Sequence, residues 1–305
     1  MVSLSDIKQF FRGYIGINEP MAKYTSMRVG GPADYYLEPV DKMDLVEIIL
    51  YLRNNKFPTL MLGRGSNLLV SDEGIRGAAI NIEAALANVR MEGDLVVAEA
   101  GVTLAKFVDF CVQKGLAGAE MLAGIPGSMG GAIVMNAGAH GGEISDHLVE
   151  VEVLREGRLQ SIKKEDAQFA YRRSGFGNDI VLGASFRLSE GNKEELLAKR
   201  RELILKRNAS QPLHLPNSGS MFKNPPGNFA AKLIEQAGLK GKRVGNAQIS
   251  EKHANFIVNL GGAKATDVFT LIDLARRTVH QNAGLLLELE VKLIGFPDET
   301  RKQVA

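Results

Sequence analysis

The densest chemistry in the chain lies in residues 217–225, which read NSGSMFKNP. They place two hydroxyls, one lysine and two amides within nine residues. Ser220 does not have the Gly-x-Ser-x-Gly surroundings of a hydrolase nucleophile, so the pattern does not indicate acyl transfer. Serine-rich turns commonly have this composition and no catalytic role. The stretch is therefore a candidate site only if other functional groups converge on it.

Two further stretches carry charged groups. The YRRS motif at 171–174 contains adjacent arginines, which are usually solvated surface residues. Residues 285–294 read LLLELEVKLI, and a period of two would place Glu288, Glu290 and Lys292 on one face of a strand. That face is either solvated, where an exposed ion pair contributes little, or part of a site. Periodicity alone does not decide between these alternatives.

Residues 121–142 contain seven glycines and no Asp, Glu, Lys or Arg. A dense glycine cluster indicates positive φ angles or a bulky group lying against bare backbone. A membrane helix with a Gly-x-x-x-Gly dimerisation face is disfavoured by the interior Pro126 and the many polar residues. A turn-rich core segment without any ligand is the remaining alternative, and composition alone favours it.

A second glycine turn, GRGSN at 63–67, follows a predicted strand at 59–62. A strand that leads into such a turn, with exposed backbone amides, is typical of a phosphate cradle. The turn begins like a dinucleotide-binding fingerprint, but its sixth position is Leu68 and a strand pattern follows instead of a helix. The sequence therefore argues against a Rossmann site, and it contains no Walker A motif.

Composition limits the classes of function. The chain has 305 residues, which predicts two or three domains, and its net charge is +2, which gives no electrostatic reason to expect nucleic acid or an anionic membrane. The single cysteine, Cys111, excludes an intramolecular disulfide, a thiolate iron–sulfur cluster and a multi-cysteine zinc site. The five histidines lack metal-binding spacing. Asp6 lies where an export signal would be apolar, so we expect a cytoplasmic setting.

The periodicities predict a β-rich middle third with one clear helix, typical of an α+β domain whose glycine turns face one ligand. Predicted helices lie near 4–11, behind Asp41, at 104–112 behind Thr103, at 192–208, at 229–236 behind Asn228, and behind Thr266. Predicted strands lie at 59–62, 68–70, 78–82, 95–99, 148–155, 159–162, 180–188 and 285–294. The Pro-flanked segment 211–216 is a plausible domain boundary.

Six motifs in this order resemble the UDP-N-acetylenolpyruvoylglucosamine reductases, the MurB family of bacterial cell-wall synthesis. They are TSMRVGGPA, GRGSNLLVSD, AGIPGSMGGAIVMNAG, YRRSGF, NSGSMFKNPPGNFAAKLIEQAGLKG and LELEVKLIG. Each is weak alone, but together they span nearly the whole chain. The resemblance implies an α+β fold with a FAD-binding domain of the vanillyl-alcohol-oxidase/PCMH type in two subdomains, residues 1–75 with 284–305 and residues 76–209. It also implies a separate α+β substrate-binding domain at 210–283.

The resemblance further implies FAD as cofactor and NADPH as hydride donor. The implied FAD contacts are Gly63, Arg64, Gly65, Ser66, Asn67, Pro126, Gly127, Ser128, Gly130, Gly131, Asn136 and Gly138.

By matching motifs, Ser220 is the proton donor, Arg172 stabilises the enolate formed after hydride transfer, and Glu290 hydrogen-bonds near the substrate carboxylate. Tyr171, Lys223 and Asn224 are the implied substrate contacts. A cation where negative charge develops and a positioned acid suit this reaction.

One departure from the family pattern is informative. Longer members carry a tyrosine, on a loop after the YR motif, that closes over the substrate, whereas this chain has no tyrosine after Tyr171. The chain therefore resembles the shorter type II subtype. We expect a monomer that binds a UDP-sugar, without nucleic acid or membrane insertion. Two alternatives stay open, namely a flavin oxidase of the same fold family that acts on another alcohol or acid, and a non-catalytic protein that binds FAD or a nucleotide sugar.

Overall fold

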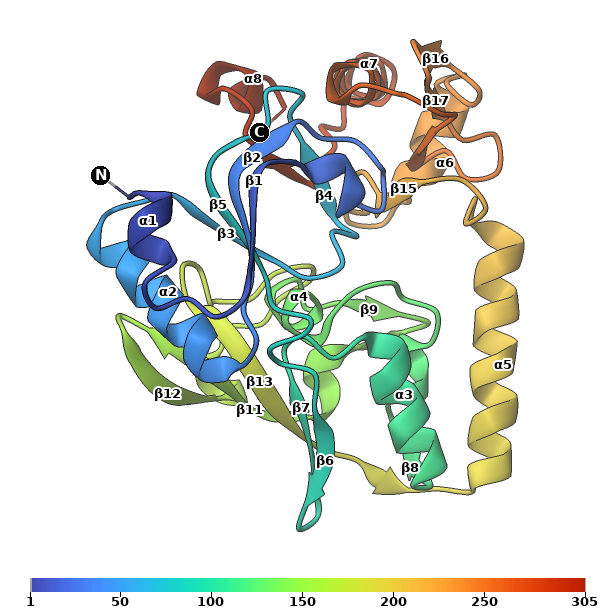
Figure 1. Cartoon of the computed structure of the whole chain (residues 1–305). Coiled ribbons are helices and arrows are strands. Elements are labelled where there is room, and N and C mark those ends of the chain that lie inside the picture. The colour runs from blue at the N-terminus through green and yellow to red at the C-terminus, as the bar shows by residue number, and fades with distance from the viewer. Residues whose placement is uncertain (1, 305) are drawn as a thin grey trace. The chain divides into compact units, whose positions relative to one another are not determined.

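The computed structural model describes residues 2–304, which form two compact units (Figure 1). The first unit contains the chain up to Gly16 together with Tyr36–Arg64 and Ala78–Arg207. The second contains Ile17–Tyr35, Gly65–Gly77 and the chain from Asn208 onward. The division falls within three strands of the sheet β1-β2-β5-β3, which are β1 (Tyr14–Pro20), β2 (Pro32–Glu38) and β5 (Ile75–Asn81). The finer division at residues 75, 209 and 283 stays a prediction.

The first unit is built around a five-stranded antiparallel sheet of order β12 (Arg158–Lys163), β11 (Leu148–Arg155), β13 (Ile180–Arg187), β7 (Leu95–Glu99) and β6 (Val89–Glu92), with its β6–β7 and β11–β12 hairpins visible in Figure 1. Its central strand β13 is buried except for Arg187, because strands pair with it on both sides and helix α4 (Met129–Val134) contacts it. Phe107 of α3 packs on Phe186 of that strand with ring centroids 4.9 Å apart. Cys111, on the same helix face as Phe107, is fully buried.

The strands and helices of this unit, including those of that sheet, have the following bounds. Its strands are β3 (Thr59–Leu62), β6 (Val89–Glu92), β7 (Leu95–Glu99), β8 (Leu116–Ala117), β9 (Gly138–Ala139), β10 (Gly142–Glu143), β11 (Leu148–Arg155), β12 (Arg158–Lys163), β13 (Ile180–Arg187) and β14 (Ser189–Glu190). Its helices are α1 (Leu4–Ile7), α2 (Lys42–Asn54), α3 (Leu104–Gln113), η2 (Glu120–Leu122), α4 (Met129–Val134), η3 (Ile144–His147), η4 (Lys164–Asp166) and α5 (Lys193–Ser210).

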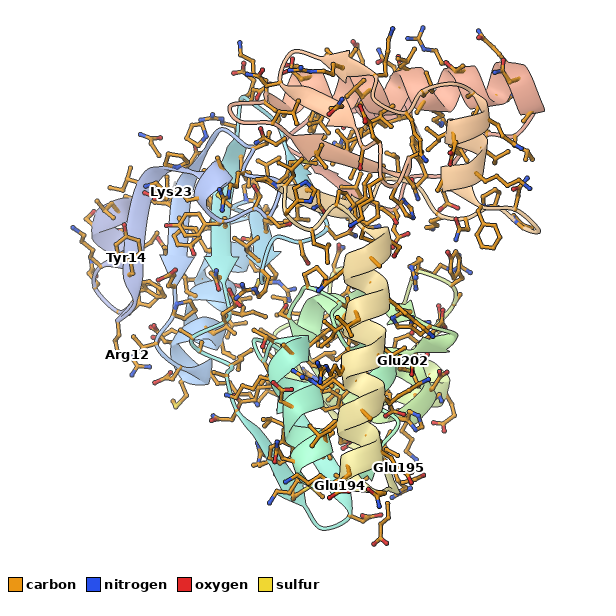
Figure 2. All side chains as sticks on the ribbon, turned by 90° about the vertical axis from the view of Figure 1, so that its right-hand side faces the viewer. Arg12, Tyr14, Lys23, Glu194, Glu195 and Glu202 are labelled. Carbon is orange, nitrogen blue, oxygen red and sulfur yellow. The ribbon has the colours of Figure 1, made fainter. Side chains whose placement is uncertain are left out.

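The helix α5 is rich in charged residues and buries few apolar residues. Figure 2 shows Glu194, Glu195 and Glu202 among the acidic side chains along it. Arg200 of α5 forms an ion pair of 2.6 Å with Asp109 of α3, which ties the two helices together. Only Leu196 and Leu203 of α5 are buried, so little apolar area holds this helix in place.

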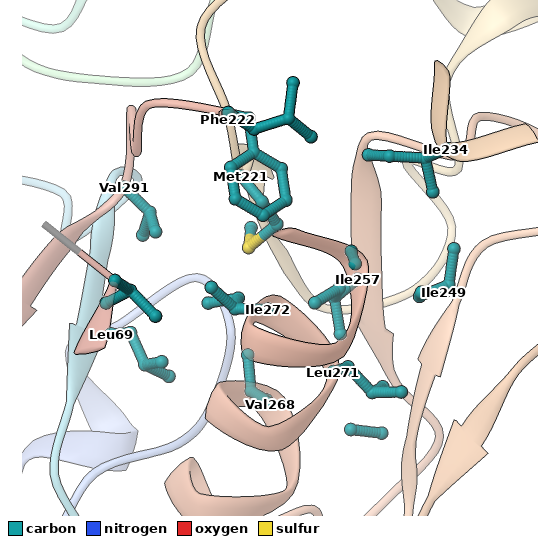
Figure 3. Close-up of a cluster of buried hydrophobic side chains, with 14 of the residues drawn as sticks. Leu69, Met221, Phe222, Ile234, Ile249, Ile257, Val268, Leu271, Ile272 and Val291 are labelled. Carbon is teal, nitrogen blue, oxygen red and sulfur yellow. The ribbon is translucent and has the colours of Figure 1, made fainter. Parts of the chain in front are cut away.

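The second unit has a four-stranded antiparallel sheet of order β15-β18-β17-β16. Its strands and helices are η1 (Met21–Lys23), β4 (Leu68–Val70), β15 (Asn217–Ser220), α6 (Ala230–Gln236), β16 (Arg243–Val244), β17 (Ala247–Ile249), β18 (Phe256–Asn259), α7 (Ala265–Ala283), β19 (Lys292–Ile294) and α8 (Asp298–Gln303). Val268, Leu271 and Ile272 of α7 enter a buried cluster that Figure 3 shows beside Met221 and Phe222. The segment that follows Ser220 is therefore anchored in this core.

Several expected elements are confirmed, including the strands Thr59–Leu62 and Leu95–Glu99 and the caps Asp41 and Thr103, whose side chains accept hydrogen bonds from Asp44 N and Lys106 N. The expected strand at 285–294 is mostly wrong. Only Lys292–Ile294 pairs as a strand, with β4, and Leu289 forms a single bridge to Phe222.

The caps expected for α6 and α7 are also wrong, because distant or unexpected residues supply them. Asn224 Oδ1 accepts from Ala230 N at 3.0 Å at the start of α6. Asp72 accepts from Ala265 N at 2.7 Å and from Thr266 N at 3.0 Å at the start of α7. Among residues 2–304, no helix is long and apolar enough to cross a membrane. The same residues contain no group of three metal-ligating side chains.

Candidate functional site

In the second unit, the segment after Ser220 pairs with the segment that carries the two glutamates. Glu290 N donates to Met221 O at 2.9 Å, and Lys223 N donates to Glu288 O at 2.9 Å. These bonds flank the antiparallel bridge between Phe222 and Leu289. The pairing joins two motifs about 65 residues apart, and it places the Ser220 segment next to Glu290.

Burial separates the two glutamates that sequence periodicity left equivalent. The side chain of Glu288 is 72% exposed and contacts Lys223 Nζ, whose own side chain is only 16% exposed. Glu290 is half-buried. The ammonium of Lys223 is therefore held by a surface carboxylate, whereas Glu290 lies in a more enclosed environment.

The end of the 63–67 turn contacts the same segment of the second unit. Asn67 Nδ2 donates to Glu290 O at 3.0 Å, and Lys292 N donates to Asn67 O at 3.0 Å. Ser218 Oγ donates to Leu68 O at 2.8 Å, just before Ser220. The structure thus brings together the backbones around Asn67, Ser220 and Glu290, three residues that come from three different motifs.

In the first unit, Arg172 is tied to the glycine-rich segment. Its Nη2 donates to Gly138 O at 2.8 Å, and its guanidinium lies 4.9 Å from the ring centroid of Tyr171. Arg172 and Asn136 both adopt left-handed backbone, with φ of +56° and +43°. This conformation costs a non-glycine residue about 1–2 kcal/mol, and such strain often marks functional positions. The side chain of Arg172 is therefore fixed by contacts with Gly138 and Tyr171 and is not freely solvated.

Asn136 fixes the loop that carries Arg172. It is fully buried, and its Nδ2 donates to the Glu143 carboxylate at 2.7 Å and to Ala170 O at 3.1 Å. The second of these bonds reaches the residue before Tyr171. Its side-chain amide therefore holds the YRRS loop against the 136–138 segment, and the expected contact of Asn136 with the cofactor stays a prediction.

Arg207, which lies outside the six motifs, adds a second positive charge whose field interacts with that of Arg172. Burial, and next the charge of Arg172, lower the pKa of Arg207 to about 10. Burial also lowers the pKa of His140, with the charge of Arg207 acting in the same direction. Two guanidinium groups close enough to affect each other suit an anionic ligand. In the sequence, only the place of Arg207 at the basic end of a charged helix could have indicated it as a candidate site residue.

The structure separates glycines required by the fold from one that it does not require. A Cβ on Gly63 would lie 2.1 Å from Ser128 Oγ, one on Gly138 would lie 2.3 Å from Gly142 O, and one on Gly65 would lie 2.1 Å from Tyr24 O. Packing therefore explains these three.

Gly131 differs from the other predicted cofactor glycines. It is exposed and helical, it has no positive φ, and its added Cβ would meet nothing nearer than Ser128 Oγ at 3.5 Å. By contrast, Gly127 has a φ of +149°, and a Cβ on Gly130 would lie 3.0 Å from Ala100 Cβ. Contacts within the fold therefore do not require glycine at 131, and its bare backbone is open to a ligand.

The other predicted contact residues lie as follows. Arg64 Nη1 is 3.4 Å from Glu83 Oε1, and Ser128 Oγ accepts from Gly131 N at 3.4 Å at the start of α4. Ser66 is half-buried and Pro126 is exposed. Tyr171 is 45% exposed, and Asn224 is exposed while it accepts the bond from α6.

Comparison with known proteins places this arrangement in a family. A UDP-N-acetylenolpyruvoylglucosamine reductase of Chloroherpeton thalassium is 47% identical over 311 residues, which cover 99% of this chain and all of that protein. The chain belongs to the UDP-N-acetylenolpyruvoylglucosamine reductase family. The reductase of Caldanaerobacter subterraneus is 44% identical over 286 residues, or 93% of this chain and 94% of that one. Both alignments extend across the two units.

Structure and domain comparisons agree with membership of the reductase family. The crystal structure of UDP-N-acetylenolpyruvylglucosamine reductase from Thermus caldophilus matches with a TM-score of 0.79 and 37% identity, covering 93% of this chain and 100% of that one. Residues 33–162 match a FAD binding domain, and residues 211–294 match the C-terminal domain of the reductases. These matches confirm the resemblance drawn from the six motifs, the predicted fold class and FAD as the cofactor.

Proposed function

We propose that this chain reduces the enolpyruvyl group of UDP-N-acetylglucosamine enolpyruvate to give UDP-N-acetylmuramate, a precursor of peptidoglycan. FAD is the bound cofactor and NADPH is the hydride donor. The observation that carries the proposal is the end-to-end match to a reductase at 47% identity. We also propose that the protein acts in the cytoplasm, as a monomer that binds a UDP-sugar.

The residues of the first unit fit a flavin dinucleotide. Gly131 offers bare backbone that the fold itself does not need, beside the buried hydroxyl of Ser128. Arg172 and Arg207 add positive charge in the same unit, which suits phosphate or carboxylate groups. When bound, FAD supplies the transfer of hydride equivalents from NADPH to the methylene carbon of the substrate. Gly131, Ser128 and Gly127 are the residues that we expect to hold it.

The chain's own groups handle charge and the proton. Hydride addition to the methylene carbon breaks the carbon–carbon double bond and leaves an electron pair on the carbon next to the carboxylate. The fixed positive charge of Arg172 stabilises that electron pair as an enolate. The hydroxyl of Ser220 then gives its proton to that carbon, and solvent restores the hydroxyl, so that one hydride and one proton are added in total. The assignment of Arg172 and Ser220 to one substrate rests on the family motifs that contain them.

A serine hydroxyl is a weak acid, so its neighbours matter. Glu290 lies on the chain segment paired with the residue after Ser220 and is assigned to hydrogen-bond near the substrate carboxylate. The mostly buried Lys223 is held by Glu288 and is assigned to the substrate, where its positive charge also favours the alkoxide left on Ser220. Tyr171 and Asn224 keep their assignments as substrate contacts.

Product analysis tests the proposal. The holoenzyme should oxidise NADPH only when UDP-N-acetylglucosamine enolpyruvate is present, and the product mass should rise by two hydrogens. Oxygen consumption with another alcohol or acid, without any need for the UDP substrate, would instead identify a flavin oxidase. A bound flavin that NADPH cannot reduce would identify a non-catalytic binding protein.

A further inference from the structure

Asn255 directs both polar atoms of its side chain and its backbone carbonyl to the segment after Ser220. It is only 3% exposed. Its Oδ1 accepts from Phe222 N at 3.0 Å, and its Nδ2 donates to Phe222 O at 2.7 Å. Its backbone carbonyl accepts from Met221 N at 2.8 Å. One buried side chain thus satisfies both backbone groups of Phe222.

On the other side of Ser220, Ser218 is buried and bonded to Leu68 O at 2.8 Å, and Gly219 N donates to Asn217 Oδ1 at 3.0 Å, but Asn255 does not reach this side and Gly219 itself has open space around it. Gly219 has a φ of +74°, and a Cβ added to it would meet nothing within 4 Å. The pairing of β15 with β18 is also irregular between Asn217 and Ser220. Glycine in open space permits backbone rotation. Asn255 therefore holds the chain on the C-terminal side of Ser220, through Met221 and Phe222.

The same contacts bear on Glu290. Met221 O accepts from Glu290 N at 2.9 Å, while Met221 N is bonded to Asn255 O at 2.8 Å. Phe222, between the two hydrogen bonds of Asn255, forms the bridge to Leu289. A shift of the Phe222 backbone would therefore move Ser220 and would also alter its spacing from Glu290.

We propose that Asn255 is a positioning residue for proton delivery by Ser220, an assignment that rests on the proposed function. Asn255 acts through the Met221–Phe222 backbone and does not touch the substrate. A displacement of about 1 Å in a reacting group can cost about 10²-fold in rate. Loss of the Asn255 side chain should therefore slow the proton-dependent step far more than it weakens binding.

Asn259 provides a matched control. It too is 3% exposed, and it lies at the end of β18, the strand that follows Asn255. Its Nδ2 donates to Met27 O at 3.0 Å, and its Oδ1 accepts from Gly261 N at 2.8 Å and Ala263 N at 3.0 Å. Its side chain bonds no residue of the Ser220 segment in these contacts. Replacement by alanine removes buried hydrogen bonds in both cases, but only one of the two variants loosens Phe222.

The experiment compares Asn255→Ala with Asn259→Ala as FAD-loaded enzymes in anaerobic stopped flow. For Asn255→Ala we expect re-oxidation of the reduced flavin by the UDP substrate to slow by about 10- to 100-fold. Reduction by NADPH and the Kd of the substrate should each stay within about threefold of wild type. Asn259→Ala should lower the midpoint of unfolding to a comparable degree while it re-oxidises within about threefold of wild type.

A second variant keeps the test open if Asn255→Ala does not fold. In Asn255→Asp the protonated carboxyl can both accept from Phe222 N and donate to Phe222 O, whereas the ionised form can only accept. Burial raises the pKa of such a carboxyl. We expect the rate of re-oxidation, relative to wild type at each pH, to recover as the pH falls through that pKa.

The outcomes separate the two proposals. Wild-type protein whose reduced flavin the UDP substrate cannot re-oxidise would overturn the proposed function, and this assignment with it. If wild-type re-oxidation is normal, two results in the variants would overturn the Asn255 assignment alone. In the first, both alanine variants lose re-oxidation equally. In the second, Asn255→Ala or Asn255→Asp behaves like wild type at every pH.

Discussion

The side-chain amide of Asn67 donates a 3.0 Å hydrogen bond to the backbone carbonyl of Glu290. The carbonyl of Asn67 in turn accepts from Lys292 N at 3.0 Å, next to the parallel pairing of β4 with β19. The amide of Asn67 thus holds the segment that carries a candidate catalytic group, and the expected contact of Asn67 with the cofactor stays a prediction. Asn67 therefore fixes the backbone position of Glu290.

Replacing Asn67 by alanine should therefore affect turnover more than cofactor content. A hydrogen bond of this kind contributes about 1 kcal/mol, so we expect re-oxidation of the flavin by the UDP substrate to slow by about fivefold. The ratio of flavin to protein absorbance should remain near that of wild type. Purification of Asn67→Ala without FAD would show instead that its main role is to bind the cofactor.

The two glutamates of the C-terminal segment should behave differently. Glu290→Gln removes a half-buried carboxylate next to the Ser220 segment, and we expect kcat to fall by about 10²-fold. Glu288→Gln removes a 72% exposed partner of Lys223, and exposed pairs contribute only about 0–1 kcal/mol. We expect its kcat to stay within about threefold of wild type, as steady-state kinetics would measure. A larger loss in Glu288→Gln than in Glu290→Gln would reverse the assignment.

Gly131 and Gly63 test whether glycine is required by the ligand or by the fold. In Gly131→Ala the new methyl group meets only ordinary contacts, so the protein without cofactor should unfold within about 0.5 kcal/mol of wild type or be slightly more stable. Its affinity for FAD should nevertheless fall, by at least about tenfold. In Gly63→Ala the methyl group would lie 2.1 Å from Ser128 Oγ, so we expect lost stability as well as lost FAD. Unchanged FAD affinity in Gly131→Ala would remove this glycine from the cofactor site.

His253 should make the protein less stable in mild acid. Burial, aided by the charge of Lys240, lowers the pKa of His253 in the folded state below its usual 6.5. The unfolded chain therefore binds more protons between the two pKa values, so stability is full above 6.5 and is lost as the pH falls toward the lower value.

In the wild type, the rings of His253 and Phe256 lie 4.8 Å apart between centroids. The matched variant is His253→Phe, which keeps an aromatic ring against Phe256 but cannot titrate. Urea unfolding between about pH 7.5 and 5.5 should show a smaller loss of stability in the variant than in wild type. Equal losses in the two proteins would mean that other groups cause the acid sensitivity.

Local signals in the sequence predicted much of the first unit. The β11–β12 hairpin and the strand Leu95–Glu99 follow from residue alternation, and Asp41 and Thr103 cap helices that begin within one residue of them. The same reasoning failed at 285–294, because the regular alternation there coincides with one bridge, Leu289 to Phe222, and one short strand. It also failed at α7, where the capping carboxylate of Asp72 comes from 193 residues away.

The sequence predicted which residues belong to the candidate site, but it did not predict how they are arranged in space. The motifs named Ser220 and Glu290, but their proximity depends on a long-range pairing that periodicity does not encode. Asn255 carries no sequence signal, because its function depends on the backbone it contacts and not on its neighbours in the sequence. Arg207 looks like an ordinary basic helix end in the sequence, because its burial and the effect of the Arg172 charge on its pKa depend on the tertiary structure.

The most direct test of the account is the pair of anaerobic half-reactions in wild type and Ser220→Ala. NADPH should reduce the bound flavin at the same rate in both proteins, because no proton from Ser220 is needed in that step. Re-oxidation by UDP-N-acetylglucosamine enolpyruvate should proceed in wild type and be slower by at least about 10²-fold in Ser220→Ala. Equal loss of both half-reactions in the variant with FAD still bound, or re-oxidation at the wild-type rate, would contradict the role of Ser220 as the proton donor.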